Sequence, residues 1–495
     1  MGSTTTAHLI GLIPRTCERS PVMSESGLDA AQAKMRDAGV DPIAIDVFSS
    51  YYTQIEEGRT GIIPEDSISP LTDPDRLDDV TVDDEVAADA LDHTVIIKLN
   101  GGLGTSMGLD RAKSLLPVRN GKSFLDIIVG QVRAAREQHG ARLPLLFMDS
   151  FNTRDDTLEA LEQYPDVQVD GLPLDFLQNQ EPKLRADDLT PVEFPTDPRL
   201  EWCPPGHGDL YTALLGSGIL DQLLDKGYRY ASVSNGDNLG ATPDARIAGW
   251  FAATGAPYAA ELCRRTVNDR KGGHLAVRKS DGHLVLRDTA QTADDEMTYF
   301  TDESRHPFFH TNNLWFDLRA LREVMTERHG VMGLALIRNE KTVDPKDSST
   351  TPVIQVESAM GAAIEVFEGA TCIVVDRARF LPVKTTNELL LLRSDVYDLD
   401  ERFHLCKTTD NVCEVDLDKQ FYKRVGDFDR RLGEPPSLKD ATSLKVAGDW
   451  TFGAHVTVTG DAVLSTDEPA TVPDGAELSG EVHPADIDTV SRASQ

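Results

Sequence analysis

The sequence predicts an α/β protein with a mixed, mainly parallel sheet, followed by a smaller β-rich domain. Two patterns lead to this prediction. Short apolar runs alternate with helical patterns from Val95 to about Arg265, and after about Lys439 short β runs are punctuated by Gly, Asp and Pro. At 495 residues the chain is too long for one ordinary core, so we expect one large domain with a smaller one appended.

The first 90 residues are predicted to form an N-terminal arm and a helical segment. Residues 1–21 are polar apart from a short apolar insert, and Met23 is an alternative start. From Ser26 to about Tyr52, small and apolar residues recur on one helical face, which indicates a pair of helices. Residues 60–84 are rich in Pro, Asp and Ser, so we expect an extended connector into the main domain.

Residues 91–400 are predicted to form the main domain. Its first runs, VIIKL, FLDIIVGQVRAAREQ, LPLLFMD and TLEALEQY, follow the order strand, helix, strand, helix. Such βαβα order implies a mainly parallel sheet with helices on both faces, and sites in such sheets lie at the carboxyl ends of the strands. HLAVRKSDGHLVLRD is instead predicted to be a β-hairpin that turns at Ser280-Asp281-Gly282, at an edge of the sheet.

The remaining residues are divided into a connector, 401–438, and a C-terminal domain, 439–495. Valines recur near a spacing of six in LKVAGDWTFGAHVTVTGDAVL. This spacing resembles the coils of a β-helix, although a small sandwich would give a similar pattern. We expect a β-helix-like domain whose terminal PADIDTVSRASQ is frayed.

Composition restricts the partners. The net charge of −33, from 82 acidic and 49 basic residues, would repel nucleic acid and anionic membranes, so we expect neither as a partner. A polyanionic substrate must therefore be met by a few local cations, backbone N–H groups or a metal. The six cysteines form no CxxC motif and are typical of free thiols in a reducing cytosol. No run approaches the ~18 apolar residues of a membrane span, so we expect a cytoplasmic protein.

The glycine-rich stretch KLNGGLGTSMGLDRAKS, which follows the first strand of the main domain, predicts a phosphate-binding loop. It fails the dinucleotide fingerprint, because Met107 stands where the third glycine is needed, and it fails Walker A, because Ala112 replaces the glycine before Lys113. A third option is the loop of nucleotidyltransferases. There Gly101 and Gly102 let the backbone approach the nucleotide, and Lys113 reaches phosphate oxygens. In isolation a plain tight turn followed by a solvated Lys113 explains the glycines equally well.

Two further motifs lie before a helix and after a strand. PPGHGD places His207 between two glycines at the start of a helix, where free N–H groups favour an anion and the ring could bond a phosphate or a sugar hydroxyl. SNGDNLGAT places Asp237 at a strand end, as suits Mg²⁺, which prefers few protein oxygens together with phosphate and water. In isolation an ordinary loop histidine and an Asx turn explain these motifs equally well.

Two later motifs add candidates. Asn312, in HTNNLWFD, offers a donor and an acceptor to sugar hydroxyls, and Lys384, in RFLPVKTT, supplies a second cation. No cluster has zinc-site spacing and no nucleophile motif is present, so covalent catalysis is not indicated.

Together these motifs resemble those of the UTP–glucose-1-phosphate uridylyltransferases of the eukaryotic-like type. The motifs KLNGGLGTSMG, PPGHGD, SNGDNLGAT, KGG, TNNLW, QVESAMGAAI and RFLPVKTT occur in that family's order, and VAGDWTFGAHVTVTG resembles its C-terminal β-helix. The resemblance implies a Rossmann-like, GT-A-like nucleotidyltransferase core. It also implies the reaction of UTP with α-D-glucose 1-phosphate, with Mg²⁺, to give UDP-glucose and pyrophosphate.

The resemblance also implies roles for individual residues. Nucleotide binding falls to Leu99, Asn100, Gly101, Gly102, Lys113, Gln180, Gly206, Asn235, Gly236, Asp237 and Lys384. His207 and Asn312 would contact the sugar phosphate, Lys113 and Lys384 would be catalytic, and Asp237 would bind the metal.

The chain departs from that family's pattern in two places. Leu109 to Ala112 stand where Cys-x-Gly-Pro is common, and His310 replaces an asparagine, which could alter contacts to the sugar. A UDP-N-acetylhexosamine or broad UDP-sugar enzyme is an alternative, although Asn100, where those relatives usually have Ala, favours glucose. A non-catalytic nucleotide-sugar-binding scaffold is an alternative from another class, and whether the chain forms a homo-oligomer stays open.

Overall fold

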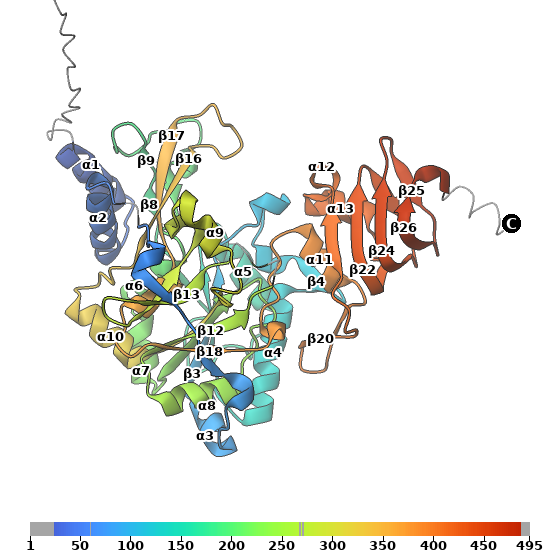
Figure 1. Ribbon diagram of the computed structural model, residues 1–495. Coiled ribbons are helices and arrows are strands. Elements are labelled where there is room, and N and C mark those ends of the chain that lie inside the picture. Colours follow the sequence, from blue (N-terminus) through green and yellow to red (C-terminus); the bar gives the residue numbers. More distant parts are fainter. Residues whose placement is uncertain (1–23, 60, 267–268, 270–271, 487–495) are drawn as a thin grey trace, which may run out of the picture.

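The computed structural model describes residues 24–59, 61–266, 269 and 272–486. The predicted arm of residues 1–21, the alternative start at Met23, Lys271 of the KGG motif and residues 487–495 lie outside the described part. The described chain forms a large α/β lobe and a smaller β lobe (Figure 1). The lobes meet beside helix α11 (Thr386–Arg393), which contacts strands of both.

The large lobe is built on a mixed sheet. Its main path runs in the order β2-β18-β12-β15-β11-β3-β6-β7. Along this path β15 pairs antiparallel with both of its neighbours, and every other pairing is parallel. The bounds are β2 (Asp75–Arg76), β18 (Thr371–Val374), β12 (Tyr258–Arg264), β15 (Phe308–Asp317), β11 (Tyr230–Asn235), β3 (Thr94–Asn100), β6 (Leu145–Asp149) and β7 (Asp175–Leu177). The predicted mixed, mainly parallel sheet is confirmed.

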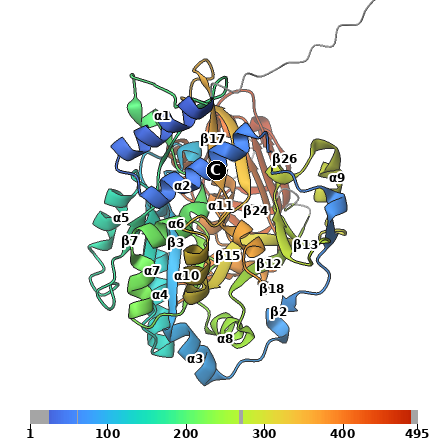
Figure 2. The same cartoon turned by 90° about the vertical axis from the view of Figure 1, so that its left-hand side faces the viewer.

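Helices cover both faces of this sheet because the strands are apolar on both sides. Val95 and Ile97 of β3 belong to one buried cluster, and Ile96 between them belongs to another, as the two-residue period of a strand requires. Figure 2 shows the helices around the sheet. Ile96 shares its cluster with α3 (Asp84–Asp92), α4 (Phe124–His139) and α8 (Ala245–Thr254), and Val95 shares its cluster with α6 (Leu210–Gly216), α7 (Ile219–Asp225) and α10 (Leu318–Glu327).

Local signals in the sequence fix the ends of α4. Ser123 accepts a hydrogen bond from the Asp126 backbone N–H, and the Asp126 carboxylate accepts one from the Ser123 backbone N–H. This capping box satisfies two N–H groups that a helix start leaves unpaired. Gly140 ends the helix in the left-handed conformation, which glycine adopts without steric cost.

The N-terminal predictions hold for the described residues. The helical pair is α1 (Ser24–Asp37) and α2 (Pro42–Glu56). The connector is extended, as expected, and it also contributes two strands: β1 (Ile68–Pro70) pairs with β13 (His274–Arg278), and β2 pairs with β18.

The predicted hairpin is β13 paired antiparallel with β14 (Leu284–Arg287). It branches from the main path, because β13 also pairs with β15.

Short antiparallel sheets complete the large lobe. They are β4–β5 (Pro117–Arg119, Lys122–Ser123), β8–β10 (Glu181–Pro182, Trp202–Cys203), β16–β17–β9 (Leu336–Thr342, Pro352–Ser358, Leu184–Arg185) and β19–β20 (Tyr397–Leu399, Leu405–Lys407); helices α5 (Arg154–Leu161) and α9 (Met297–Phe300) lie between strands. The five cysteines in the described part are free thiols. None of the described helices is long and apolar enough to cross a bilayer.

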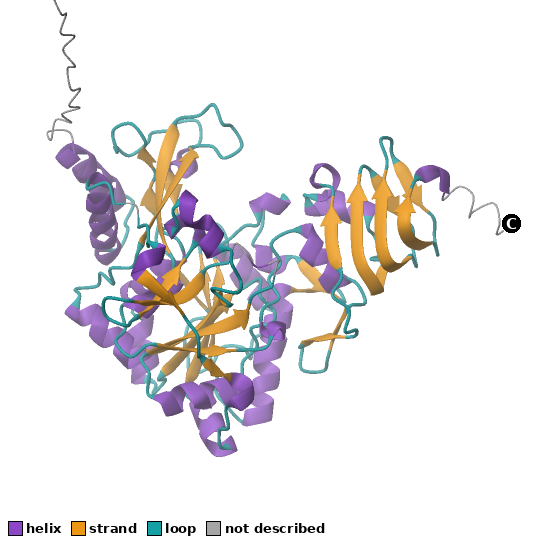
Figure 3. Cartoon of the chain, in the orientation of Figure 1, coloured by secondary structure: helices purple, strands orange, loops and turns teal. Residues whose placement is uncertain are grey.

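The small lobe contains two parallel sheets, drawn as stacked arrows in Figure 3. One has the order β21-β22-β24-β26 and the other pairs β23 with β25. Leu444 pairs with Ala462, and Ala462 pairs with Gly480, each 18 residues further along the chain. The bounds are β21 (Glu414–Leu417), β22 (Ser437–Ala447), β23 (Trp450–Phe452), β24 (Thr457–Ser465), β25 (Ala470–Val472) and β26 (Glu477–Val482). Helices α12 (Lys419–Tyr422) and α13 (Val425–Arg431) lie between β21 and β22.

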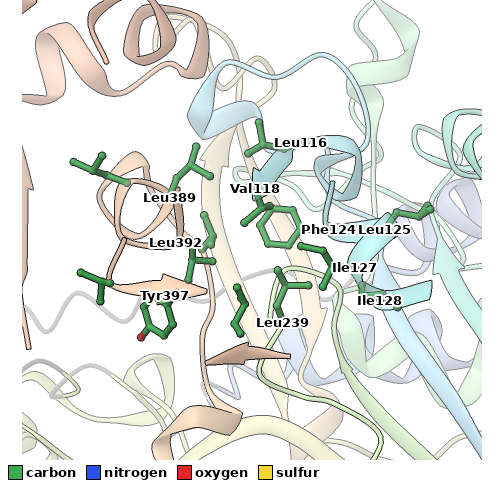
Figure 4. Packing of buried hydrophobic residues seen from close by; sticks show 14 of the residues in the cluster. Leu116, Val118, Phe124, Leu125, Ile127, Ile128, Leu239, Leu389, Leu392 and Tyr397 are labelled. Carbon is green, nitrogen blue, oxygen red and sulfur yellow. The ribbon is translucent and has the colours of Figure 1, made fainter. Parts of the chain in front are cut away.

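One continuous apolar core links the lobes. Figure 4 shows Val118 and Phe124 of the large lobe facing Leu389, Leu392 and Tyr397 across the junction. The same buried cluster continues to residues of β22 and β24. The small lobe therefore packs against the segment that follows the glycine-rich loop.

Candidate functional site

Two of the predicted motifs, the glycine-rich loop and SNGDN, follow the carboxyl ends of β3 and β11, which are neighbours in the sheet. Asn235, the last residue of β11, pairs with Leu99 of β3. Leu99 is half-buried, and the glycine-rich loop begins two residues later. The loop and SNGDN thus leave adjacent strands on the same side, as the parallel order predicts.

The glycine-rich loop folds back on itself before Lys113. A Cβ at Gly101 would come within 2.9 Å of the Gln178 side chain, and a Cβ at Gly102 would meet no protein atom within 4 Å and would project into open space. The N–H of Lys113 donates to the carbonyl of Gly102 at 3.2 Å. The loop therefore returns Lys113 to the point where it left the strand.

Lys113 joins the two strand ends electrostatically. Its Nζ lies 2.5 Å from Oδ2 of Asp237 and also donates to the Val383 carbonyl, next to Lys384. Both side chains of the ion pair stay partly exposed, at 17% and 23%. The structure thus brings Lys113, Asp237 and the backbone before Lys384 into direct contact.

Gly236 allows the loop after β11 to approach β3. Its N–H donates to the Leu99 carbonyl at 2.8 Å, and a Cβ there would lie 2.8 Å from that same oxygen. Any side chain would push the two strand ends apart. Asn235 is half-buried between them.

The PPGHGD motif lies against the end of β17. Gly206 has φ +79°, and a Cβ there would lie 2.6 Å from the Ser358 carbonyl, so only glycine fits. The N–H of Met360 donates to Nδ1 of His207 at 3.0 Å. Nδ1 is therefore an acceptor, and the neutral ring carries its proton on Nε2. Burial lowers the pKa of His207, which favours that neutral form.

A buried acidic pair supports Gln180. Asp209, at the end of the 3₁₀ turn His207–Asp209, accepts hydrogen bonds from the backbone and side-chain amides of Asn179. Burial raises the pKa of Asp209 to about 7 and raises that of the neighbouring Glu181, which Asp209 raises further. Gln180 is half-buried and lies in the chain between Asn179, which Asp209 holds, and the buried Glu181.

Asn312 lies in a bulge of β15. Ala260 pairs with Leu314 and Leu262 pairs with His310, so β15 has extra residues opposite β12. Asn312 adopts φ +59° there, a conformation that asparagine tolerates better than most residues and that is often found at functional sites.

His310 lies beneath this bulge. It is 6% exposed, and its Nδ1 accepts a hydrogen bond from the Asn312 N–H at 3.0 Å. Its Nε2 is buried and has no hydrogen-bond partner among the described residues, and its Nδ1 also lies 3.2 Å from Oδ1 of Asn312. Burial lowers the pKa of His310 to about 4, and nearby His207 contributes to this shift. The His310 ring therefore stays neutral beside the neutral ring of His207.

A buried ion pair forms the floor of the site. Glu261 of β12 accepts hydrogen bonds from Arg379 at 2.8 Å and from the Trp315 indole at 2.9 Å. The Arg379 carbonyl accepts from the side-chain amides of Asn238 and Asn313. This network fixes the loop that continues to Lys384. Lys384 is exposed, and within the described chain its ammonium has no hydrogen-bond or ion-pair partner.

Asn100 is the predicted nucleotide residue whose side chain points elsewhere. Its Nδ2 donates to Oδ1 of Asp149 at 2.7 Å and to the Thr157 hydroxyl at 2.8 Å. The side chain is 5% exposed, so it anchors the strand end from behind. Any bearing of Asn100 on the choice of sugar is therefore indirect.

Two functional features escape sequence reasoning. Lys98 opens the glycine-rich motif, yet its ammonium is buried against the Ser234 hydroxyl and the Ala241 carbonyl, and burial lowers its pKa to about 7. The segment Asp149–Thr157 holds the glycine-rich loop through Ser150, whose hydroxyl donates to the Gly101 carbonyl at 2.8 Å. The run SFNTRDDT predicts a turn followed by the start of a helix, but it does not predict that this segment contacts the glycine-rich loop.

A separate hollow of about 800 Å³ lies at the junction of the lobes. Arg119 and Arg393 donate there to backbone carbonyls of the protein, and Glu434 pairs with His455. Because these charges already have partners, the hollow does not offer the free cations that a polyanion needs.

The site offers one carboxylate to a metal. Within the described ranges, no group of three or more His, Cys, Asp or Glu residues is arranged to hold a metal. Oδ2 of Asp237 faces Lys113, and its carboxylate stays partly exposed at the strand end. This donor set fits Mg²⁺, which binds through one or two carboxylates together with phosphate and water, and it does not fit zinc.

Comparisons with known proteins agree with the motifs. The family described as UTP--glucose-1-phosphate uridylyltransferase matches residues 45–459. The UTP--glucose-1-phosphate uridylyltransferase of Solanum tuberosum is 37% identical over 424 residues, 84% of each chain. That of Saccharomyces cerevisiae is 37% identical over 394 residues, 78% of this chain and 77% of the yeast chain.

Solved structures are similar in fold. The L281D mutant of UDP-glucose pyrophosphorylase from Leishmania major, in complex with UDP-Glc, superposes with a TM-score of 0.86 at 42% identity, covering 93% of this chain and 99% of the other. A structure described as UDP-glucose phosphorylase from Trypanosoma brucei gives a TM-score of 0.85 at 41% identity, covering 92% of this chain and 99% of the other.

Acid should destabilise the protein partly through His310. The folded state holds this ring neutral down to a pKa of about 4, whereas the unfolded chain protonates it near 6.5. Its contribution to the free energy of unfolding is therefore present above pH 6.5 and is lost as the pH falls toward 4, by ~3 kcal/mol. We expect His310→Asn to flatten the pH dependence in urea unfolding between pH 7 and 4.

The matched control for this measurement is His329→Asn, at an exposed histidine, which should keep the wild-type slope. An unchanged slope in His310→Asn would contradict the buried neutral state.

Proposed function

We propose, because this chain belongs to the UTP--glucose-1-phosphate uridylyltransferase family, that it transfers the uridylyl group of UTP to α-D-glucose 1-phosphate. The products are UDP-glucose and pyrophosphate. The observation that carries the proposal in this chain is the contact of Lys113 with Asp237 and with the Val383 carbonyl. This contact brings the Lys113 ammonium, the Asp237 carboxylate and the loop that carries Lys384 together at the ends of adjacent strands.

The proposed reaction is an in-line displacement at the α-phosphorus of UTP. A phosphate oxygen of glucose 1-phosphate forms the new P–O bond, and the bond from the α-phosphorus to the oxygen that bridges to the β-phosphate breaks. Pyrophosphate leaves with that electron pair. Because the attacking group is already an anion, no general base is needed. The barrier lies in bringing two polyanions together in line.

Cations near the α-phosphorus reduce that barrier. We assign Lys113 and Lys384 as the catalytic residues, because each supplies a flexible ammonium that can meet charge on the α-phosphate and on the departing pyrophosphate. Lys113 is held at the strand ends, and Lys384 is exposed beside the Val383 carbonyl that Lys113 contacts. In a chain of net charge −33, such local cations must counter a repulsive background.

We assign the uridine and phosphate contacts to Leu99, Gly101, Gly102, Gln180, Gly206, Asn235 and Gly236, with Asn100 contributing through its backbone. The open space above Gly102 and the anchored backbone of Asn179, next to Gln180, support these roles. We assign the sugar phosphate to His207 and Asn312. The tautomer of His207 leaves Nε2–H as its free donor, which suits an oxygen-rich ligand.

We assign Mg²⁺ to Asp237. When bound with the triphosphate, the metal would neutralise phosphate charge as a Lewis acid. Asp237 would hold it at the strand end, and Lys113, released from the carboxylate, would turn to the phosphates.

The finer architecture is also a proposal. We assign residues 1–90 to the N-terminal segment, 91–400 to a GT-A-like catalytic domain, 401–438 to a connector and 439–495 to a β-helix. Parallel pairing of successive strands at intervals of 18 to 20 residues supports a β-helix. The connector supplies β21 to that lobe. We propose a cytoplasmic location on the basis of the free thiols.

The function is tested by pyrophosphate release from UTP and Mg²⁺ with the 1-phosphates of glucose, galactose and N-acetylglucosamine. We expect glucose 1-phosphate to give the highest kcat/KM. A preference for N-acetylglucosamine, or equal use of all three, would favour the alternative pyrophosphorylases. UDP-glucose binding without turnover of any of them would favour a non-catalytic scaffold.

Lys113→Ala should lower kcat by at least ~100-fold, because a charge partner of the transition state is lost. The melting temperature should stay near that of wild type, since the pair with Asp237 is partly exposed. Lys407→Ala, at an exposed lysine, is the control. Near-normal kcat in Lys113→Ala would refute the catalytic assignment.

Asp237→Asn should weaken the response to Mg²⁺, because a neutral amide is a poorer ligand for a hard cation. The measurement is initial rate against Mg²⁺ concentration, which we expect to shift to higher concentrations by ~10-fold or more. Asp225→Asn, at an exposed aspartate of α7, should titrate as wild type. An unchanged titration in Asp237→Asn would rule out its role as a ligand.

A further inference from the structure

The exit of the glycine-rich loop is anchored by a residue outside every predicted motif. Ala112, the residue before Lys113, is 2% exposed, and its N–H donates to Oδ2 of Asp156 at 2.9 Å. The other carboxylate oxygen of Asp156 lies 3.7 Å from Nε of Arg111. Asp156 therefore contacts the two residues that directly precede Lys113.

The entrance of the loop is held by the same short segment. The Ser150 hydroxyl donates to the Gly101 carbonyl, and Asn100 bonds to Asp149 and Thr157. Both ends of the loop are thus tied to residues 149–157, where β6 ends and α5 begins. A loop fixed at both ends loses much of the freedom that would let Lys113 shift.

We propose that Asp156 is a positioning residue for Lys113 in the reaction proposed above, on which this inference rests. The ammonium of Lys113 contacts Asp237 in this structure and must turn to the phosphates during the reaction. Such a movement keeps its direction only if the backbone at the root of the side chain stays fixed. The hydrogen bond from Ala112 to Asp156 supplies that fixed point one residue before Lys113.

The hydrogen bond from the Ala112 N–H to Asp156 holds the backbone more firmly than the ion pair of Asp156 with Arg111 does. The Arg111 side chain is 61% exposed and the Asp156 side chain 26%, so their attraction is screened by water and contributes little to stability. Ala112 is buried, and its N–H would be left without an acceptor if the carboxylate were removed. The same contact holds the stretch Leu109 to Ala112, where the chain departs from the related pattern, to α5.

The test compares Asp156→Ala with Asp156→Asn in the full chain. Asp156→Ala should lower kcat by roughly 100-fold, the effect of a small displacement of a catalytic group, with the Kd for UTP within about threefold of wild type. Asp156→Asn keeps an amide oxygen for the Ala112 N–H and should recover kcat to within about fivefold of wild type. Asp155→Ala, at the exposed neighbour on the same helix, should stay within about twofold.

Hydrogen exchange gives a readout that needs no turnover. The Ala112 amide should exchange at least 10-fold faster in Asp156→Ala than in wild type, and Asp156→Asn should restore most of the protection. Asp156→Leu, which keeps the volume without an acceptor, should behave as Asp156→Ala.

The outcomes separate the two proposals. If wild type releases no pyrophosphate, the proposed function fails, and exchange at Ala112 still tests the anchor. If wild type is active and Asp156→Ala keeps its kcat, the positioning role is overturned and the function stands. Failure of both Asp156→Ala and Asp156→Leu to fold, or an Asp156→Asn variant as slow as Asp156→Ala, would also overturn the positioning role.

Discussion

The site depends on one buried ion pair, between Glu261 and Arg379. A carboxylate that is 1% exposed is costly to bury unless it is paired and fully hydrogen-bonded. Burial alone would raise the pKa of Glu261, but the Arg379 guanidinium and the amide donors around it hold the pKa below its usual value. Because Arg379 must stay with Glu261 in the middle of β12, the loop that carries Arg379 cannot leave this strand. The Asn238 side chain then fastens this loop to the segment after β11 through the Arg379 carbonyl.

The position of the Lys113 ammonium depends on that fixed loop. Val383 lies four residues beyond Arg379, and its carbonyl holds the Lys113 ammonium beside Asp237. Three segments far apart in the chain thus meet at one cation. An acidic protein can handle polyanionic substrates in this way because the cations are few and fixed, whereas its acidic residues are spread over the surface.

The sequence allowed much of this to be predicted because strand ends and motifs follow local rules. The run around Val95 required burial on both faces, and parallel order required the glycine-rich loop and SNGDN to leave the sheet on one side. Contacts made by backbone groups could not be predicted in this way. Nothing in Asp156 distinguishes it from Asp155 in the sequence, since the difference lies in which carboxylate faces the Ala112 N–H.

The burial of individual polar side chains could not be predicted from the sequence either. Lys98 stands in the phosphate-loop motif beside residues that face the site, yet the two-residue period of β3 directs its ammonium into the interior. Asp209 accepts hydrogen bonds from the backbone and side-chain amides of Asn179, and this contact becomes apparent only when the segments after β7 and before α6 are brought together. The hydrogen bond from the Asn312 N–H to His310 depends likewise on a bulge, which no periodicity predicts.

The division of charge within the site fits the proposed chemistry. In the proposed reaction, Lys113 and Lys384 would meet the negative charge that develops around the α-phosphorus. His207 and Asn312 would meet the sugar phosphate with neutral donors, beside His310, whose lowered pKa also keeps its ring uncharged. Interactions that strengthen only in the transition state accelerate the reaction, whereas a strong grip on the ground state does not. Placing full charges at the reacting phosphorus and neutral donors at the sugar therefore serves turnover better than a uniformly cationic site would.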